Sequence, residues 1–243
     1  MDHGTRRQSI VETILGQLFQ GRIKPRERLR VEHLAEQFEV SVTPIREALV
    51  ELAGLGVIEL QANRGAVVCD FGPLQVLEIY HLRRILECEA TRGACDRIAP
   101  FELESLRGAF SKLVGARRTA KWSAETRQLD SQLHELITAR CGNERLAYEI
   151  RRYSVLFRLL RDARHSKRTE RDHYGQMNEN AEHLAIVDAL NAGDADLAAN
   201  AMAYHLSQSA NALVQDLFTD QQIEVERAVA FLQTRASSLT VPR

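Results

Sequence analysis

The sequence predicts a mostly helical protein in two parts: three helices and a β-hairpin at the N-terminus, followed by an all-α antiparallel helical bundle. Short amphipathic segments and two β-rich runs fill the first part, whereas helical periodicity continues from there almost to the C-terminus. A length of 243 residues suits two hydrophobic cores, since domains cluster at about 100 to 150 residues. We therefore expect domains at 1–71 and 72–218, with a C-terminal helix and tail at 219–243.

The N-terminal part is predicted to begin with three helices. Apolar residues recur at intervals of three and four from about residue 6 to 19, and a shorter helix follows at 31–40. The third helix is expected to begin where Thr43 can cap it and where Pro44 suits the first turn, with Ile45 facing inward.

A β-hairpin is predicted after the third helix. The β-rich runs VIEL and AVVC are separated by QANRG, in which Asn63 and Gly65 can adopt positive φ. Three helices followed by a hairpin is the order of elements in a winged helix-turn-helix.

Helices are predicted throughout the second part. Breaks in the periodicity from residue 72 delimit about six of them, and a seventh is expected at 221–234. The breaks lie near Pro100, Arg118–Lys121, Cys141–Asn143, Ser166–Arg168 and Gly193–Asp194.

The composition argues against several classes of protein. No apolar run approaches the roughly 20 residues of a membrane span, and no signal peptide is evident, so we expect a cytoplasmic protein without membrane contact. The four cysteines have no C-x-x-C spacing and are expected to be free thiols. A net charge of −1 argues against nonspecific polyanion binding, but five of the nine residues from Arg22 to Arg30 are basic. This basic patch either faces phosphate groups or is a solvated loop.

The first turn of the third helix is the candidate for contact with DNA bases. A helix in the major groove presents polar or basic side chains from its N-terminus, where Thr43 and Arg46 lie, and the predicted wing carries Arg64. Taken singly, each residue also has a structural explanation: Thr43 can simply cap its helix, and Arg46 can pair with Glu47 or Glu51.

The run SVTPIREALVELAGLGVIELQANRGAVV resembles the signature of GntR-type transcriptional regulators, and the similarity extends over nearly all of residues 6–70. The resemblance implies that Arg30, Thr43 and Arg46 contact operator DNA in the major groove or at its phosphates. It also implies that Gly65 lets the wing backbone enter the minor groove.

Two residues depart from the pattern of that family. Val42 stands where an arginine usually follows the serine, which removes a contact worth about 1–3 kcal/mol of base discrimination. We expect a changed sequence preference or weaker binding. Arg26 stands where glycine commonly follows the proline, so the turn there is expected to differ.

The helical part contains candidate metal ligands. Asp130 and His134 are four residues apart, so they project from one face of a helix and can share a metal ion, although a charged surface pair has the same spacing. His183 and His205 lie in apolar stripes, where each can also be a core histidine. Together the four residues form a donor set for zinc, nickel, manganese or iron.

This part resembles the FCD ligand-binding domain that accompanies many GntR-like DNA-binding domains. The resemblance runs from about residue 72 to 217 through LRRILE, LDSQLHELI, CGN and EHLAIVDALNAGDADLAANAMAYHL. It implies that Asp130, His134, His183 and His205 bind a divalent metal, most simply zinc or nickel, with manganese or iron as alternatives. It further implies that the metal receives an organic acid effector. A domain of about six helices is similar to that of the shorter, VanR-like subgroup.

Arg83 is the candidate partner for a carboxylate of the effector, because a guanidinium binds carboxylates through two parallel hydrogen bonds. An intrahelical pair with Glu87 explains the same spacing. The family resemblance also implies a homodimer on a two-fold operator, with repression relieved by the ligand.

Two alternatives differ in function. The cluster of Asp130 and the three histidines can be purely structural, without an effector. The second alternative is a metal-dependent helical enzyme, but the chain lacks H-E-x-x-H, a phosphate-binding glycine loop and G-x-S-x-G. The sequence therefore favours a regulator that is not an enzyme.

Overall fold

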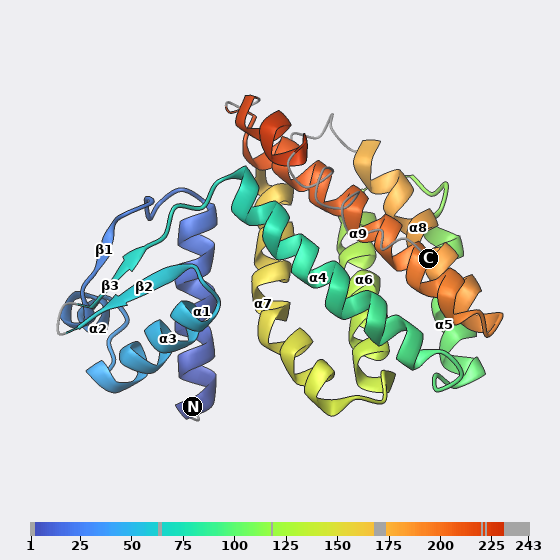
Figure 1. Ribbon diagram of the computed structural model, residues 1–243, viewed down its shortest axis with the longest axis horizontal. Coiled ribbons are helices and arrows are strands. Elements are labelled where there is room, and N and C mark those ends of the chain that lie inside the picture. The colour runs from blue at the N-terminus through green and yellow to red at the C-terminus, as the bar shows by residue number, and fades with distance from the viewer. Residues whose placement is uncertain are drawn as a thin grey trace, which may run out of the picture. The chain divides into compact units, whose positions relative to one another are not determined.

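The computed structural model describes residues 3–62, 65–117, 119–167, 174–219, 221 and 223–230 (Figure 1). Contacts within the chain divide it into two compact units. Unit 1 comprises Met1–Gly72 with Tyr153–Ser166, and unit 2 comprises Pro73–Arg152 with Lys167–Arg243. The predicted fold class is confirmed: a winged helix-turn-helix precedes a helical bundle.

Unit 1 contains the three predicted helices and a small antiparallel sheet. The sheet has the strand order β1-β3-β2, so the predicted hairpin is joined by a further strand that the sequence did not predict. The elements are α1 (His3–Phe19), β1 (Arg28–Leu29), α2 (Val31–Gln37), α3 (Val42–Gly54), β2 (Ile58–Gln61) and β3 (Gly65–Val68).

The start of α3 differs from its prediction. Ser41 is the N-cap residue, with extended backbone at φ −69° and ψ 165°, and the helix begins at Val42. Thr43 is therefore a residue of the first turn, and the prediction that it caps the helix is wrong. Ile45 and Leu52 have no solvent exposure, as their helical spacing predicts.

Glycine is required where β3 meets β1. Gly65 has a φ of 83°, and a Cβ atom there would lie 2.1 Å from the carbonyl oxygen of Leu29. Strand β1 pairs with β3 through Leu29 opposite Ala66. The close approach of the two backbones therefore leaves no room for a side chain at residue 65.

Arg26 occupies a turn with the backbone in the left-handed region, at φ 64°. Its backbone N–H donates to Val68 O at 2.9 Å. Its guanidinium makes three hydrogen bonds to Asp70: Nε donates to Oδ1 at 3.3 Å and to Oδ2 at 3.1 Å, and Nη2 donates to Oδ2 at 2.7 Å. The arginine thus adopts a conformation that favours glycine, and its side chain connects the turn to Asp70, two residues beyond the end of β3.

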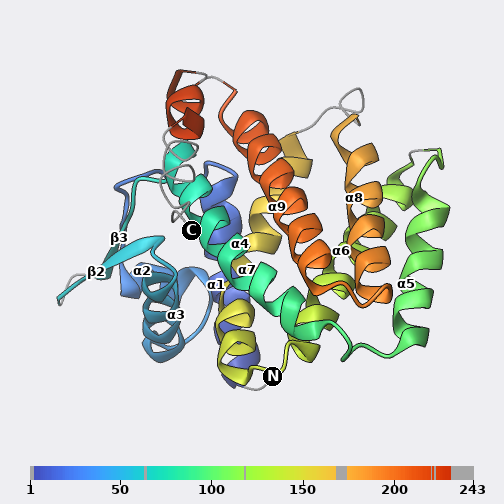
Figure 2. The same ribbon diagram turned by 45° about the vertical axis from the view of Figure 1, so that its right-hand side comes forward.

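Among the described residues the six predicted helices of the bundle are α4 to α9, which are labelled in Figure 2, and unit 2 contains them except for residues 153–166 of α7. Helix α9 packs against α4 and α8, α5 packs against α6 and α8, and α4 packs against α6. No helix among the described residues is long and apolar enough to cross a membrane. The helices are α4 (Pro73–Ala94), α5 (Pro100–Leu113), α6 (Ala120–Arg140), α7 (Glu144–Lys167), α8 (Tyr174–Asn191) and α9 (Ala195–Leu217).

Helix α7 contributes to both units. Its residues 153–166 belong to unit 1, where Arg158 Nη2 lies 2.6 Å from Glu12 Oε1 of α1. Of the C-terminal helix predicted at 221–234, residues 223–230 are helical and residue 221 is not, whereas residues 222 and 231–234 lie outside the described residues.

The start of α6 is fixed by two hydrogen bonds. The Thr119 side chain accepts from the backbone N–H of Trp122 at 3.1 Å, and the Trp122 indole N–H donates to Leu113 O of α5 at 3.0 Å. Trp122 is 4% exposed, so its large ring fills the core while its one polar atom is satisfied.

Candidate functional site

A basic groove lies between α3 and the strands of unit 1. It has a volume of about 610 Å³ and brings together three of the residues predicted to contact DNA: Arg30, Arg46 and Gly65. Its lining residues are Arg28, Arg30, Val31, Glu32, Arg46, Leu49, Gln61 and Gly65.

The polar tip of α3 is exposed as predicted. Thr43 and Arg46 are both solvent-exposed on the first two turns, three residues apart and hence on one face. Among the described residues Arg46 makes no ion pair with Glu47 or Glu51, and Glu51 pairs with Arg7 at 3.0 Å. Arg64, the predicted wing residue, lies outside the described residues.

The groove also contains a residue that the sequence did not single out. Arg28 belongs to the basic patch, and its Nη2 atom donates to Gln61 Oε1 at 3.2 Å, which connects β1 to β2. Basic residues alternate at 26, 28 and 30, and this pattern could have indicated that Arg28 and Arg30 lie near each other. Because strand β1 was not predicted, the position of Arg28 in the groove was not predicted either.

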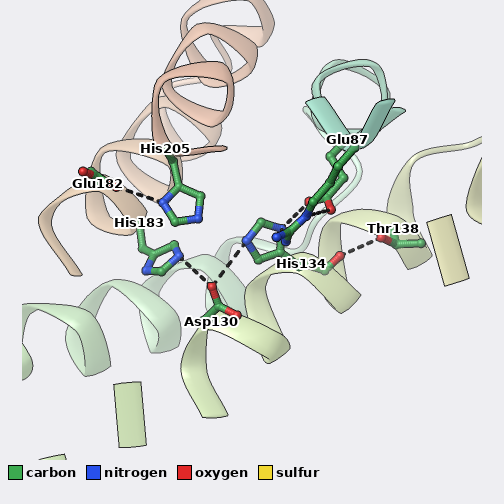
Figure 3. A network of polar contacts seen from close by, with 8 residues as sticks. Glu87, Asp130, His134, Thr138, Glu182, His183 and His205 are labelled. Carbon is green, nitrogen blue, oxygen red and sulfur yellow. Dashed lines mark hydrogen bonds and ion pairs between the residues drawn. The ribbon is translucent and has the colours of Figure 1, made fainter. Parts of the chain in front are cut away.

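A second site lies inside unit 2, where α6, α8 and α9 each direct side chains to one point (Figure 3). Asp130 and His134 come from α6, His183 from α8 and His205 from α9, and all four are buried. One ligand atom from each lies within 4.8 Å of the others. The four predicted metal ligands are thus brought together.

The arrangement of these atoms fits a metal ion. Asp130 Oδ1 lies 3.1 Å from His183 Nε2 and 3.6 Å from His134 Nε2. Donors bound to one zinc ion at about 2.0–2.2 Å lie roughly 3 to 4 Å apart. His134 Nε2 is buried without a hydrogen-bond partner among the described residues, as an unfilled ligand atom would be.

Glutamates surround the ligand cluster. Glu87 of α4 contacts His134 Nδ1 through Oε2, and its other oxygen accepts from Arg83 Nε at 2.6 Å. Glu182 Oε2 lies 3.0 Å from His205 Nδ1. Neither glutamate was predicted as part of the site, because each carboxylate meets a histidine that is far away in the sequence.

Arg83 is buried beside the cluster and forms the intrahelical pair with Glu87 that the sequence allowed. Its guanidinium also lies 5.5 Å from the centre of the Tyr80 ring. Burial raises the pKa of the Glu87 carboxyl, but the charge of Arg83 and the hydrogen bonds from Arg83 and His134 outweigh this effect and lower that pKa to about 2. Glu87 is therefore an anion at neutral pH.

The His183 ring is held by packing. Phe110 of α5 stacks on it with a distance of 5.0 Å between ring centres and an angle of 27° between planes. Phe110 has no solvent exposure, so the hydrophobic core continues to the edge of the cluster.

Two protein-family models match the chain. Residues 78–208 match the FCD domain, and residues 6–68 match the bacterial regulatory proteins of the gntR family. The first match alone covers more than half of the chain.

Curated relatives include transcriptional regulators from several bacteria. The chain is 33% identical over 139 residues to the Nta operon transcriptional regulator of Aminobacter aminovorans, covering 57% of the chain and 65% of that protein. It is 32% identical over 117 residues to the HTH-type transcriptional regulator McbR of Escherichia coli, covering 48% and 53%. The matches thus span less than two thirds of these two relatives. A third, the HTH-type transcriptional repressor RspR of E. coli, is 26% identical over 195 residues, covering 79% of the chain and 82% of that protein. These relatives are regulators, not enzymes.

The solved structures agree on the fold. The structure of E. coli McbR/YncC superposes with a TM-score of 0.64 at 23% identity, covering 86% of this chain and 97% of that one.

Proposed function

Because the chain belongs to the GntR family of bacterial regulatory proteins and carries an FCD domain, we propose that it is a repressor controlled by a small organic acid. In this proposal residues 1–71 bind operator DNA, residues 72–218 sense the effector, and residues 219–243 form a C-terminal segment. The protein is not an enzyme, and the metal is a receptor for the ligand.

The observation that carries the proposal is the convergence of Asp130, His134, His183 and His205 in a buried cluster. Imidazole and carboxylate donors together suit zinc or nickel, with manganese or iron as alternatives. A divalent metal held there supplies a Lewis acid with coordination positions left open for a carboxylate oxygen. Asp130, Glu87 and Glu182 against Arg83 give the buried groups a formal charge of −2 with neutral imidazoles, which a divalent cation cancels.

Arg83 is proposed to bind the effector carboxylate. Its side chain lies beside His134, so a ligand at the cluster would be within reach of it. Since Arg83 is paired with Glu87, an entering carboxylate would share or replace that partner. A ligand with one carboxylate on the metal and a second acidic group on Arg83 would satisfy both.

Operator contact is assigned to the groove of unit 1. Arg30, Thr43 and Arg46 would contact bases or phosphates, and Arg64 and Gly65 would bring the wing to the minor groove. Val42 is 37% exposed, so an arginine at this position would be open to contact with DNA. The valine is therefore proposed to change the sequence preference directly, because it lacks a guanidinium.

The protein is proposed to belong to the VanR-like subgroup, and the six bundle helices from α4 to α9 among the described residues support this assignment. A homodimer on a two-fold operator would double the DNA contacts. Effector binding relieves repression if the ligand and the operator favour different arrangements of the DNA-binding domains.

The sensing part of the proposal is tested by metal analysis of purified protein followed by thermal shifts with a panel of small carboxylates. We expect about one zinc or nickel ion per chain, loss of the metal in Asp130→Ala, and an increase in Tm with at least one carboxylate. Metal without any response to carboxylates favours a structural site and would overturn the sensing role.

The DNA-binding part is tested with an operator selected by the wild-type protein from random DNA. Arg46→Ala is expected to abolish specific binding in a gel-shift assay at fixed salt with the fold intact. Lys112→Ala, which removes a charge from the exposed surface of α5, is the control and should bind as wild type does. Unchanged affinity of Arg46→Ala would remove Arg46 from the interface.

A further inference from the structure

We propose that Glu87 and Glu182 are positioning residues of the metal site: each holds one histidine ligand by its Nδ1 atom and so commits the Nε2 atom to the metal. The inference rests on the proposed metal site and adds two residues that are not ligands themselves.

Glu87 is placed to hold His134. Glu87 is 3% exposed, and its carboxylate contacts His134 Nδ1 across the packing of α4 on α6. Its second oxygen accepts from Arg83 Nε, so both oxygens have partners and the carboxylate is fixed in orientation. Arg83 Nη2 is also near the same His134 Nδ1, but at 3.5 Å, at the outer limit of a hydrogen bond. The carboxylate is the closer group and therefore sets the proton on Nδ1.

Glu182 is placed to hold His205. Its carboxylate is 9% exposed and lies 3.0 Å from His205 Nδ1 across the packing of α8 on α9. Glu182 directly precedes the ligand His183, and consecutive residues point about 100° apart around a helix. His183 thus lies in the cluster, while the preceding Glu182 orients His205 of α9.

The two contacts have one chemical consequence. A neutral imidazole carries its single proton on either nitrogen, and a carboxylate at Nδ1 favours the proton there. The lone pair of Nε2 is then available to a metal, and it faces Asp130 in the case of His134. A carboxylate that accepts the other N–H of a ligand also raises its basicity, and losing such a partner typically weakens metal affinity 10–100-fold.

The expected energetic pattern separates this role from packing. Burying the carboxylates of Glu87 and Glu182, in addition to that of Asp130, costs solvation free energy. Their hydrogen bonds and the bound metal ion offset this cost. Substitution by alanine should therefore weaken metal binding. In Glu182→Ala it should lower the stability of the metal-free protein much less, because removing this buried carboxylate also relieves repulsion among the three acids, whereas Glu87→Ala also leaves the buried charge of Arg83 without the Glu87 carboxylate.

The experiment measures zinc affinity of the full chain by competition with a chromophoric chelator. Glu87→Ala and Glu182→Ala are expected to bind zinc roughly 10–100-fold more weakly than wild type. Glu182→Gln keeps an acceptor oxygen for Nδ1–H, so it should recover part of the affinity and serves if the alanine variant folds poorly. Glu89→Ala is the control, because Glu89 is an exposed carboxylate on the same helix as Glu87.

Histidine tautomers provide a readout that a packing role would not move. In ¹⁵N-detected spectra of the metal-free wild type, neutral His134 and His205 should carry their protons on Nδ1, and His205 should lose this preference in Glu182→Ala. Wild-type affinity and unchanged tautomers in both alanine variants would overturn the inference while leaving the metal site intact. Failure of wild type to bind zinc, nickel, manganese or iron would instead overturn the proposed function together with this inference.

Discussion

Replacing Gly65 by alanine should destabilise unit 1 through its sheet. The added Cβ would lie 2.1 Å from Leu29 O and 3.2 Å from Leu29 C, and both contacts are with backbone that no side-chain rotation can relieve. An alanine in the left-handed region costs about 1–2 kcal/mol. Moving β3 away from β1 also breaks one or two hydrogen bonds worth about 0.5–1.5 kcal/mol each. We therefore expect the free energy of unfolding to fall by about 2–4 kcal/mol.

The matched control is Gly16→Ala in the same unit. Gly16 lies in the interior of α1, and a Cβ there would meet no atom within 4 Å. Alanine should therefore stabilise the helix by about 0.5–1 kcal/mol. Urea unfolding followed by far-UV circular dichroism should give opposite signs for the two variants. Equal stability of Gly65→Ala and wild type, or a gain like that of Gly16→Ala, would refute the steric argument.

Two further substitutions test other parts of the molecule. The hydrogen bonds and charge of Arg26 lower the pKa of Asp70 below 3.8, so the ion pair stabilises the fold above that pH and is lost as pH falls through the lowered value. Arg26→Gly should return the Asp70 pKa toward 3.8 in a carboxyl NMR titration, and an unchanged pKa would contradict the pairing. Phe110→Ala should cost about 3–5 kcal/mol of stability in chemical unfolding, since it removes a fully buried ring, and it should weaken zinc binding by releasing His183. Phe110→Leu, which keeps most of the buried volume against His183, should lose much less stability and zinc affinity; losses equal to those of Phe110→Ala would show that the filled volume does not hold His183 in place.

The four predicted metal ligands could be selected from the sequence because their signal is local. Asp130 and His134 share one helical face at a spacing of four, and the apolar residues around His183 and His205 mark these as buried positions. Bringing them to one point needed the tertiary packing of α6, α8 and α9, which the family resemblance supplied.

The partners of these ligands could not be found in the same way. A glutamate beside a histidine on a helix has the appearance of solvated surface, and Glu182 meets His205 only because α8 packs on α9. Likewise β1 has two residues, too few for an alternation of apolar and polar residues to be recognised. It forms because it pairs with β3. Thr43 was assigned as a cap from residue preference, whereas Ser41 has the extended backbone that a cap position requires.

The buried position of Trp122 has a practical consequence, because it is the sole tryptophan of the chain. Its indole lies in the core of unit 2, at the start of the helix that carries Asp130 and His134. Tryptophan emission therefore reports on the bundle alone, whereas far-UV circular dichroism reports on helices of both units. Comparing the two signals during unfolding separates the melting of one unit from that of the other, without any label being added to the protein.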